Sequence, residues 1–260
     1  MNVKAVIAYD GGGFHGFAVN EGVRTIAGTL TEAISTVVRQ QVTLTGAGRT
    51  DAGVHAWGQV ISVDLPDGVD VGDLARRVNK LCAPGIAVRS VEIVGEDFNA
   101  RFSARWRQYR YEVWNAPHPN PLIRTRSWHV PVPLDVDGMN IAANHFVGEH
   151  DFASFCRRPK GLGGAQRSQV DLGVAEPSLV RNVMHTGWTV VDPDGPLVRF
   201  EIRANAFCHQ MVRSIVGSLV DVGTGKLESD ELPAILAARD RGSAGQVAPP
   251  QGLTLWEVGY

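Results

Sequence analysis

Cysteine is scarce in this sequence and long apolar runs are absent. The three cysteines, Cys82, Cys156 and Cys208, lie far apart and include no C-x-x-C pair. The sequence therefore predicts neither a disulfide framework nor a zinc site, and it fits a reducing compartment. No window reaches the ~18 apolar residues that a membrane-spanning helix needs, and MNVKAVIAYD at the N-terminus lacks the pattern of a secretory signal. We expect a cytoplasmic protein that does not enter a membrane.

Lysine is also rare, since it supplies only 4 of the 25 cationic side chains and arginine supplies the other 21. The formal net charge of -2 excludes the strongly basic character of many nucleic-acid-binding domains. Any polyanionic partner must therefore meet a local patch. The arginine bias suits bidentate contacts to carboxylates or phosphates, although genomic base composition is the simpler explanation.

The first hundred residues carry a regular alternation of strand and helix patterns. Hydrophobic residues make up 44% of the 260 residues, which is enough for packed cores. Period-2 alternation predicts strands at 3–9, 60–65 and 86–94, and helical spacing predicts helices at 26–39 and 71–81. We interpret the order as the ferredoxin-like pattern β-α-β-β-α-β, of which these segments supply three strands and both helices.

The rest of the chain repeats this theme with longer connections. It predicts strands at 108–114, 182–191 and 197–204 and helices at 137–147, 207–222 and 230–239. We therefore expect an α+β fold of two tandem ferredoxin-like-derived halves, 1–100 and 101–260. Antiparallel sheets in the two halves would flank a central catalytic cleft. Segment 157–168 holds four cations and no acid, and we expect a mobile basic loop there.

The most distinctive stretch is GAGRTDAGVH at residues 46–55, in which three glycines surround Arg49, Asp51 and His55. Glycine lets the backbone turn tightly or approach a ligand closely. An extended backbone would place Arg49 and Asp51 on one side, and a nearby cation keeps a carboxylate ionised, which suits a nucleophile. A salt bridge that ties a turn is the simpler alternative for an isolated Arg-x-Asp. The hydrogen-bonding side chains nearby, His55 included, favour a site, and we take His55 as a candidate substrate contact.

Other kinds of chemistry fit the sequence less well. Gly11, Gly13 and Gly16 spell G-x-G-x-x-G after a strand, but the dinucleotide motif needs a helix at its glycines, and the predicted helix starts about ten residues later. A nicotinamide-dependent enzyme is therefore a remote alternative. A metal site near Asp51 lacks ligands, because the histidines show no zinc-binding spacing. Glycosidase-type hydrolysis normally needs a second carboxylate, and none is close in sequence.

Residues 98–111, FNARFSARWRQYRY, carry four arginines interleaved with aromatic residues and no acid. This composition is typical of surfaces that pair with phosphates and stack on unpaired bases. We take Arg101 and Arg110 as candidate substrate contacts. Tyr111 is assigned to the core, the usual place of a strand aromatic, whereas Tyr109 at the strand entrance is a candidate for the site.

Residues 205–217, NAFCHQMVRSIVG, open a predicted helix whose buried stripe includes Met211 and Ile215. His209 and Arg213 are four residues apart and lie on another face of that helix. This face either supplies a cation to a cleft or is simply solvated.

Together these segments make the chain similar to bacterial tRNA pseudouridine synthases of the A type. The resemblance covers nearly the whole length and rests on GAGRTDAGVHA, FNARFSA followed by YRY, DFASF, RNV at 181–183, NAFCHQMVRSIVGSL and GLTL at 252–255. It implies a homodimer whose basic cleft receives the anticodon arm of tRNA, where uridines at positions 38, 39 and 40 become pseudouridine. It implies no metal and no organic cofactor.

The same resemblance implies roles for individual residues. Asp51 would be the nucleophile, Tyr109 would stack on the target uracil, Arg49 would hold the aspartate and help displace the base, and Arg213 would pair with the Asp51 carboxylate. Tyr109 is also a plausible base for the C5 proton. Attack on the sugar, proton abstraction from it and addition to the ring all remain open as the first step. The main alternative is a noncatalytic RNA-binding protein or tRNA-folding helper on the same scaffold.

Overall fold

The computed structural model describes residues 1–157, 178–193 and 195–260. The first part of the chain alternates strands and helices much as its sequence predicts. Its elements are β1 (Asn2–Tyr9), α1 (Ile26–Val38), β2 (Leu44–Gly46), β3 (His55–Asp64), α2 (Val71–Cys82) and β4 (Ile86–Ile93). Both helices begin at a capping side chain, since Thr25 accepts from the Gly28 N–H and Asp70 from the N–H groups of Gly72 and Asp73.

The second part contains more and shorter elements than expected. They are β5 (Trp106–Asn115), β6 (Trp128–Val130), α3 (Val136–Ala143), β7 (Gly148–Asp151), β8 (Val180–Val190), β9 (Leu197–Ala204), α5 (Met211–Gly223), α6 (Leu232–Ala238) and β10 (Leu253–Gly259). Apart from Arg157, the predicted basic loop at 157–168 lies outside the described residues. None of the described helices is long and apolar enough to cross a membrane.

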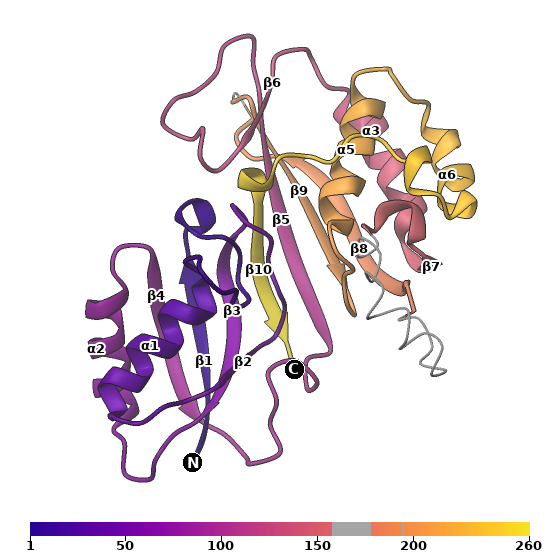
Figure 1. Cartoon of the computed structure of the whole chain (residues 1–260). Helices are drawn as coiled ribbons and strands as arrows, with labels where there is room; N and C mark the ends of the chain where they lie inside the picture. Colours follow the sequence, from indigo (N-terminus) through magenta and orange to yellow (C-terminus); the bar gives the residue numbers. More distant parts are fainter. Residues whose placement is uncertain (158–177, 194) are drawn as a thin grey trace.

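One large, mostly antiparallel sheet runs through both parts of the chain, in the order β4-β1-β3-β10-β5-β9-β8-β7 (Figure 1). The short strands β2 and β6 pair with β3 and β5. The expectation of a separate sheet in each half is therefore wrong. The physical reason is β10, the C-terminal strand, which pairs parallel to β3 and antiparallel to β5 and so closes the gap between the halves.

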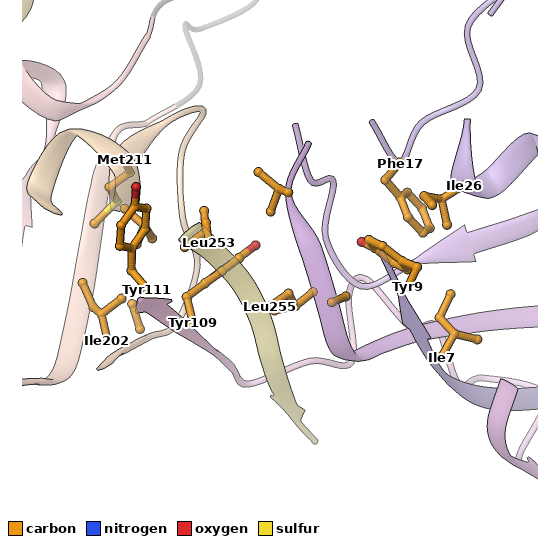
Figure 2. Close-up of a cluster of buried hydrophobic side chains, with 14 of the residues drawn as sticks. Ile7, Tyr9, Phe17, Ile26, Tyr109, Tyr111, Ile202, Met211, Leu253 and Leu255 are labelled. Atoms are coloured by element: carbon orange, nitrogen blue, oxygen red, sulfur yellow. The ribbon is translucent and has the colours of Figure 1, made fainter. Parts of the chain in front are cut away.

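The helices cover one face of this sheet in two groups. Figure 1 shows α1 and α2 beside the strands of the first part, and α3, α5 and α6 beside β8 and β9. A row of paired residues crosses the sheet on this face and consists of Tyr9, Ala56, Leu255, Tyr109 and Ile202. All five are buried. Tyr9 and Tyr109 turn their hydroxyl groups toward each other between the two groups of helices (Figure 2).

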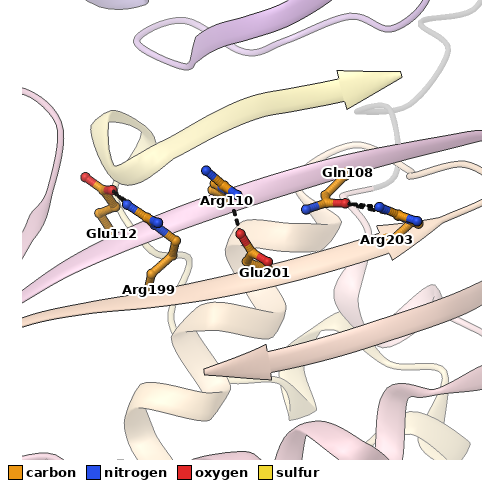
Figure 3. Close-up of polar contacts among 6 residues, drawn as sticks. All are labelled: Gln108, Arg110, Glu112, Arg199, Glu201 and Arg203. Carbon is orange, nitrogen blue, oxygen red and sulfur yellow. Dashed lines mark hydrogen bonds and ion pairs between the residues drawn. The ribbon is translucent and has the colours of Figure 1, made fainter. Parts of the chain in front are cut away.

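The opposite face carries charged and polar side chains that pair across neighbouring strands. Figure 3 shows these pairs between β5 and β9, which are Arg110 with Glu201, Arg199 with Glu112 and Arg203 with Gln108. Arg110 also lies over the Trp256 ring, 3.6 Å from its centroid. The alternation along β9 thus separates an apolar face under the helices from a face on which cations are matched by acids and amides.

Candidate functional site

Asp51 lies in the loop that joins β2 to β3 (residues 47–54), at the middle of the sheet. The loop turns sharply after Asp51, because the Val54 N–H donates to the Asp51 carbonyl at 3.1 Å and Gly53 has a φ of 80°. Gly53 therefore adopts the left-handed conformation that glycine tolerates best. Two further glycines approach this loop from beneath, since a Cβ at Gly11 would collide with the Val54 carbonyl and one at Gly16 would lie 3.0 Å from the Thr50 carbonyl oxygen.

Two glycines of the G-x-G-x-x-G spacing, Gly11 and Gly16, thus pack against the Asp51 loop, whereas a Cβ at Gly13 would meet nothing within 4 Å. The segment at Gly11–Gly13 is a short 3-10 turn, and the first α-helix begins only at Ile26. The arrangement lacks the helix N-terminus that a dinucleotide pyrophosphate requires.

The Asp51 carboxylate is contacted at both oxygens from the start of α5. Arg213 Nη1 lies 3.2 Å from Oδ2, and His209 Nε2 lies 3.3 Å from Oδ1. The expected pairing of Arg213 with Asp51 is therefore present in the structure. His209, for which the sequence allows either a cleft contact or a solvated position, is the second partner. The side chains differ in exposure, 13% for Arg213 against 47% for His209.

Backbone geometry places these two side chains. The predicted helix at 207–222 begins four residues late, at Met211, and Gln210 before it has a positive φ of 64°. This left-handed residue ends the turn that carries His209, whose carbonyl accepts from the Arg157 N–H at 2.9 Å. The guanidinium of Arg213 is fixed from behind, because its Nε donates to the Ala248 carbonyl at 2.7 Å. Arg213 therefore reaches Asp51 as an anchored side chain.

Arg49 does not take the place expected from its spacing. Its side chain is exposed, and among the described residues it forms no ion pair with Asp51 or with any other acid. The Asp51 carboxylate is instead contacted by Arg213 and His209, which come from the other half of the chain. Arg49 lines the cleft and is free to meet a ligand there.

Tyr109 lies in the cleft on β5, packed edge-on against Phe207 with ring centroids 5.0 Å apart. Burial, and next the neighbouring Tyr9 and Asp51 charges, raise the pKa of its phenol well above the usual range. The hydroxyl therefore keeps its proton in the free protein, and removal of the C5 proton by Tyr109 stays a prediction. Its position remains suited to stacking on a base.

The cleft around these residues has a volume of about 1250 Å³. Asp51 is the one acid among the described residues that line it, whereas its arginines are Arg49, Arg101, Arg107, Arg157, Arg181 and Arg213. Arg101, a predicted contact, is exposed at this surface. Arg107 is structural: it donates to the carbonyls of Ala47 and Asn205 and so ties the Asp51 loop to the second half.

Two predicted substrate contacts lie elsewhere. His55 is buried outside the cleft lining, where its Nδ1 accepts from the Gly11 N–H at 3.1 Å and its Nε2 donates to the carbonyls of Thr125 and Gln251. Arg110 points to the opposite face of the sheet, where it pairs with Glu201 (Figure 3). Neither side chain lines the cleft, because sequence proximity to Asp51 or Tyr109 does not fix which way a side chain points.

The cysteines also depart from the expectation. Cys156 and Cys208 are joined as a disulfide with their Cα atoms 5.7 Å apart, and Cys82 is a buried free thiol. The sequence separation of 52 positions between the two cysteines hid this contact in the sequence. No group of three or more His, Cys, Asp or Glu side chains that could hold a metal ion gathers within the described parts of the chain.

This arrangement defines a class of protein. A cleft rich in arginine attracts a polyanion such as a nucleic acid, and a single paired carboxylate inside it provides one reactive group. The fold and the site together are those of an α+β enzyme that acts on nucleic acid.

Comparison with known proteins gives the family. A family model described as tRNA pseudouridine synthase matches residues 5–103 and 142–260. The protein named tRNA pseudouridine synthase A from Cutibacterium acnes is 41% identical over 257 residues, which cover 98% of this chain and 87% of that protein. Proteins of the same name from Acetivibrio thermocellus and Bacillus subtilis are 36% and 37% identical, and each alignment covers 100% of this chain and 99% of the relative. The chain belongs to the tRNA pseudouridine synthase family.

Proposed function

We propose that this chain is an isomerase that converts uridine to pseudouridine at positions 38, 39 and 40 of the anticodon stem-loop of tRNA. The observation that carries the proposal is the position of Asp51, a lone carboxylate held by Arg213 in an arginine-lined cleft. The reaction breaks the bond from C1' of the sugar to N1 of uracil, turns the ring and joins C1' to C5. The same atoms are present before and after, so one carboxylate can begin the reaction and no cofactor is required.

The target nucleotide must leave its stack to reach Asp51, which costs a few kcal/mol. Tyr109 offers an aromatic ring on one side of the cleft, and Arg49 offers an exposed guanidinium in the same loop as Asp51. In the proposal, Tyr109 stacks on the flipped uracil and Arg49 occupies the place that the base leaves. Asp51 then attacks the sugar, abstracts a proton from it or adds to the ring, and the geometry is compatible with each of these first steps.

The remaining arginines of the cleft would bind the RNA backbone. Arg101, Arg157 and Arg181 come from three separate segments and line the same cleft. Guanidinium groups form bidentate contacts to phosphate, so a line of them can follow a strand without reading its sequence. These contacts would position the anticodon arm, and Asp51 would carry out the chemistry.

The proposal is tested by incubating the protein with unmodified tRNA and mapping new pseudouridines. We expect Asp51→Asn, which keeps the size of the side chain and removes its charge, to abolish product while tRNA binding persists. Asp64→Asn is the matched control, because Asp64 is an exposed carboxylate at the other end of β3 and does not line the cleft. Wild-type protein that binds tRNA and forms no pseudouridine would instead support the noncatalytic alternative.

Three further features belong to the same proposal. The order β4-β1-β3-β2 with every neighbour antiparallel supports a ferredoxin-like origin for the half at 1–100, and we propose the same origin for the half at 101–260. We propose a homodimer, to be tested by mass in solution. We propose that the protein is located in the cytoplasm, where its tRNA substrate would be present.

A further inference from the structure

A fully buried amide lies beneath the loop that carries Asp51. Gln59 is on β3, and its side chain bonds both polar groups of the Gly48 backbone. Its Nε2 donates to the Gly48 carbonyl at 2.7 Å, and its Oε1 accepts from the Gly48 N–H at 3.3 Å. The Val60 N–H donates to the same Oε1 at 3.2 Å. An amide engaged in this way cannot rotate without leaving buried polar groups unpaired, so it fixes the Gly48 backbone.

Tyr9 extends this contact to the residue before Asp51. Gln59 Nε2 donates to the Tyr9 hydroxyl at 3.4 Å, and that hydroxyl lies 2.8 Å from Thr50 Oγ1. Burial raises the pKa of Tyr9 to about 12, so its hydroxyl keeps its proton. The Thr50 carbonyl accepts from the Phe17 N–H at 3.0 Å. The chain is therefore fixed at Gly48 and Thr50, on both sides of Arg49.

Asp51 is thus held from two directions. Arg213 and His209 contact its carboxylate from the second half, whereas the Gln59 and Tyr9 pair fixes the backbone before it from the first half. Neither Gln59 nor Tyr9 lines the cleft, so neither can touch a substrate there. Any effect they have on the reaction must pass through the loop.

We propose that Gln59 is a positioning residue of the reaction, which through its hydrogen bonds to Gly48 and Tyr9 holds the 48–51 backbone where Asp51 meets the target uridine. This inference rests on the proposed function. A reactive group misplaced by about 1 Å can lose on the order of 100-fold in rate, even when substrate binding is unchanged. Loss of the Gln59 amide should therefore lower kcat and leave KM nearly constant.

The first test is Gln59→Met, which keeps the length of the side chain and removes its hydrogen bonds. We expect kcat on an unmodified tRNA to fall by roughly 10- to 100-fold, with KM and the Kd for tRNA within about twofold of wild type. Gln108→Met is the matched control, because Gln108 is also buried in the sheet, bonds Arg203 and lies outside the cleft. Its kcat should stay within about twofold of wild type.

A second pair of variants tests the network without removing the amide. Tyr9→Phe and Thr50→Val each delete one end of the same hydrogen bond with little change in shape. We expect both to lower kcat, Tyr9→Phe at least as much as Thr50→Val because it also removes the bond from Gln59. The double variant should be no slower than Tyr9→Phe alone, because interacting residues are not additive. These variants also decide the question if Gln59→Met does not fold.

The outcomes separate the two proposals. If the wild-type protein forms no pseudouridine, the proposed function fails and the positioning role of Gln59, which rests on it, fails too. If the wild type is active and folded Gln59→Met keeps full kcat, the positioning role is overturned. It is also overturned if Gln59→Met and the control Gln108→Met show the same changes in kcat and KM. Multiplying effects of Tyr9→Phe and Thr50→Val would likewise exclude a shared network.

Discussion

At the scale of single residues, the two partners of Asp51 have different surroundings and should contribute unequally. Arg213 is mostly buried and anchored to Ala248, whereas His209 is half exposed at the cleft surface. We expect Arg213→Lys to lower kcat by about 100-fold, since lysine keeps the charge and loses the anchored planar fork. His209→Gln should cost less than about tenfold, because an exposed pair contributes little.

Steady-state kinetics with an anticodon-arm substrate measure both effects, and circular dichroism confirms that each variant is folded. Arg76→Lys on the exposed surface of α2 is the control for arginine substitution. Equal losses for the Arg213 and His209 variants would contradict this division of roles.

The residues of the site could be predicted from the sequence where they belong to a recognisable motif. The directions of their side chains could not. Asp51, Tyr109 and Arg213 do meet in one cleft, although they come from three distant segments. Arg49 and His55 sit in the same motif, yet among the described residues Arg49 forms no ion pair with Asp51, and the imidazole of His55 is held by buried hydrogen bonds outside the cleft. Such directions depend on neighbours that lie far away in sequence.

At the scale of elements, β10 is the strand on which the continuous sheet depends. Leu255 is fully buried and pairs with Ala56 on β3 and Tyr109 on β5. We expect Leu255→Ala to lower the free energy of unfolding by about 2–5 kcal/mol, the usual cost of a large-to-small change in a core. Urea denaturation measures it, with Thr254→Ala on the other face of β10 as the control.

We also expect one unfolding transition, in which both halves of the chain lose structure together, because β10 belongs to both. A first transition confined to residues 101–260, with the first half still folded, would contradict this role of β10.

The helices could be read from the sequence more easily than the joints of the sheet. α1 and α2 have local apolar periodicity and capping residues, so their bounds agree with the prediction within a few residues. The strands that the sequence did not reveal are either short or formed by pairing with distant segments; they are β2, β6, β7 and β10. The pairing of β10 with β3 joins segments about two hundred residues apart. Local sequence patterns do not indicate a contact between such distant segments. For this reason the sequence predicted two separate sheets instead of one.

At the scale of the whole molecule, the buried tyrosines should make the folded state less stable as the pH rises into the alkaline range. The chain has 4 tyrosines, and burial is the largest cause that raises the pKa of each of them, Tyr9, Tyr109, Tyr111 and Tyr260. A raised pKa in the folded state means that the protonated phenol favours folding. This contribution is complete below the unfolded value of 10.0, and for Tyr9 it is lost as the pH rises toward about 12.

The rise in the pKa of Tyr9 from 10.0 to about 12 corresponds to roughly 3 kcal/mol of folding free energy. We therefore expect stability to fall above pH 10, with tyrosinate absorbance appearing together with the loss of the circular dichroism signal rather than before it. Protein unfolded in urea is the control and should ionise near pH 10 without delay. Tyrosinate that forms near pH 10 while the native circular dichroism signal persists would show that the phenols are accessible in the folded state. Because Tyr9 bonds both Gln59 and Thr50, its ionisation would also release the Asp51 loop, so activity should disappear no later than the folded signal.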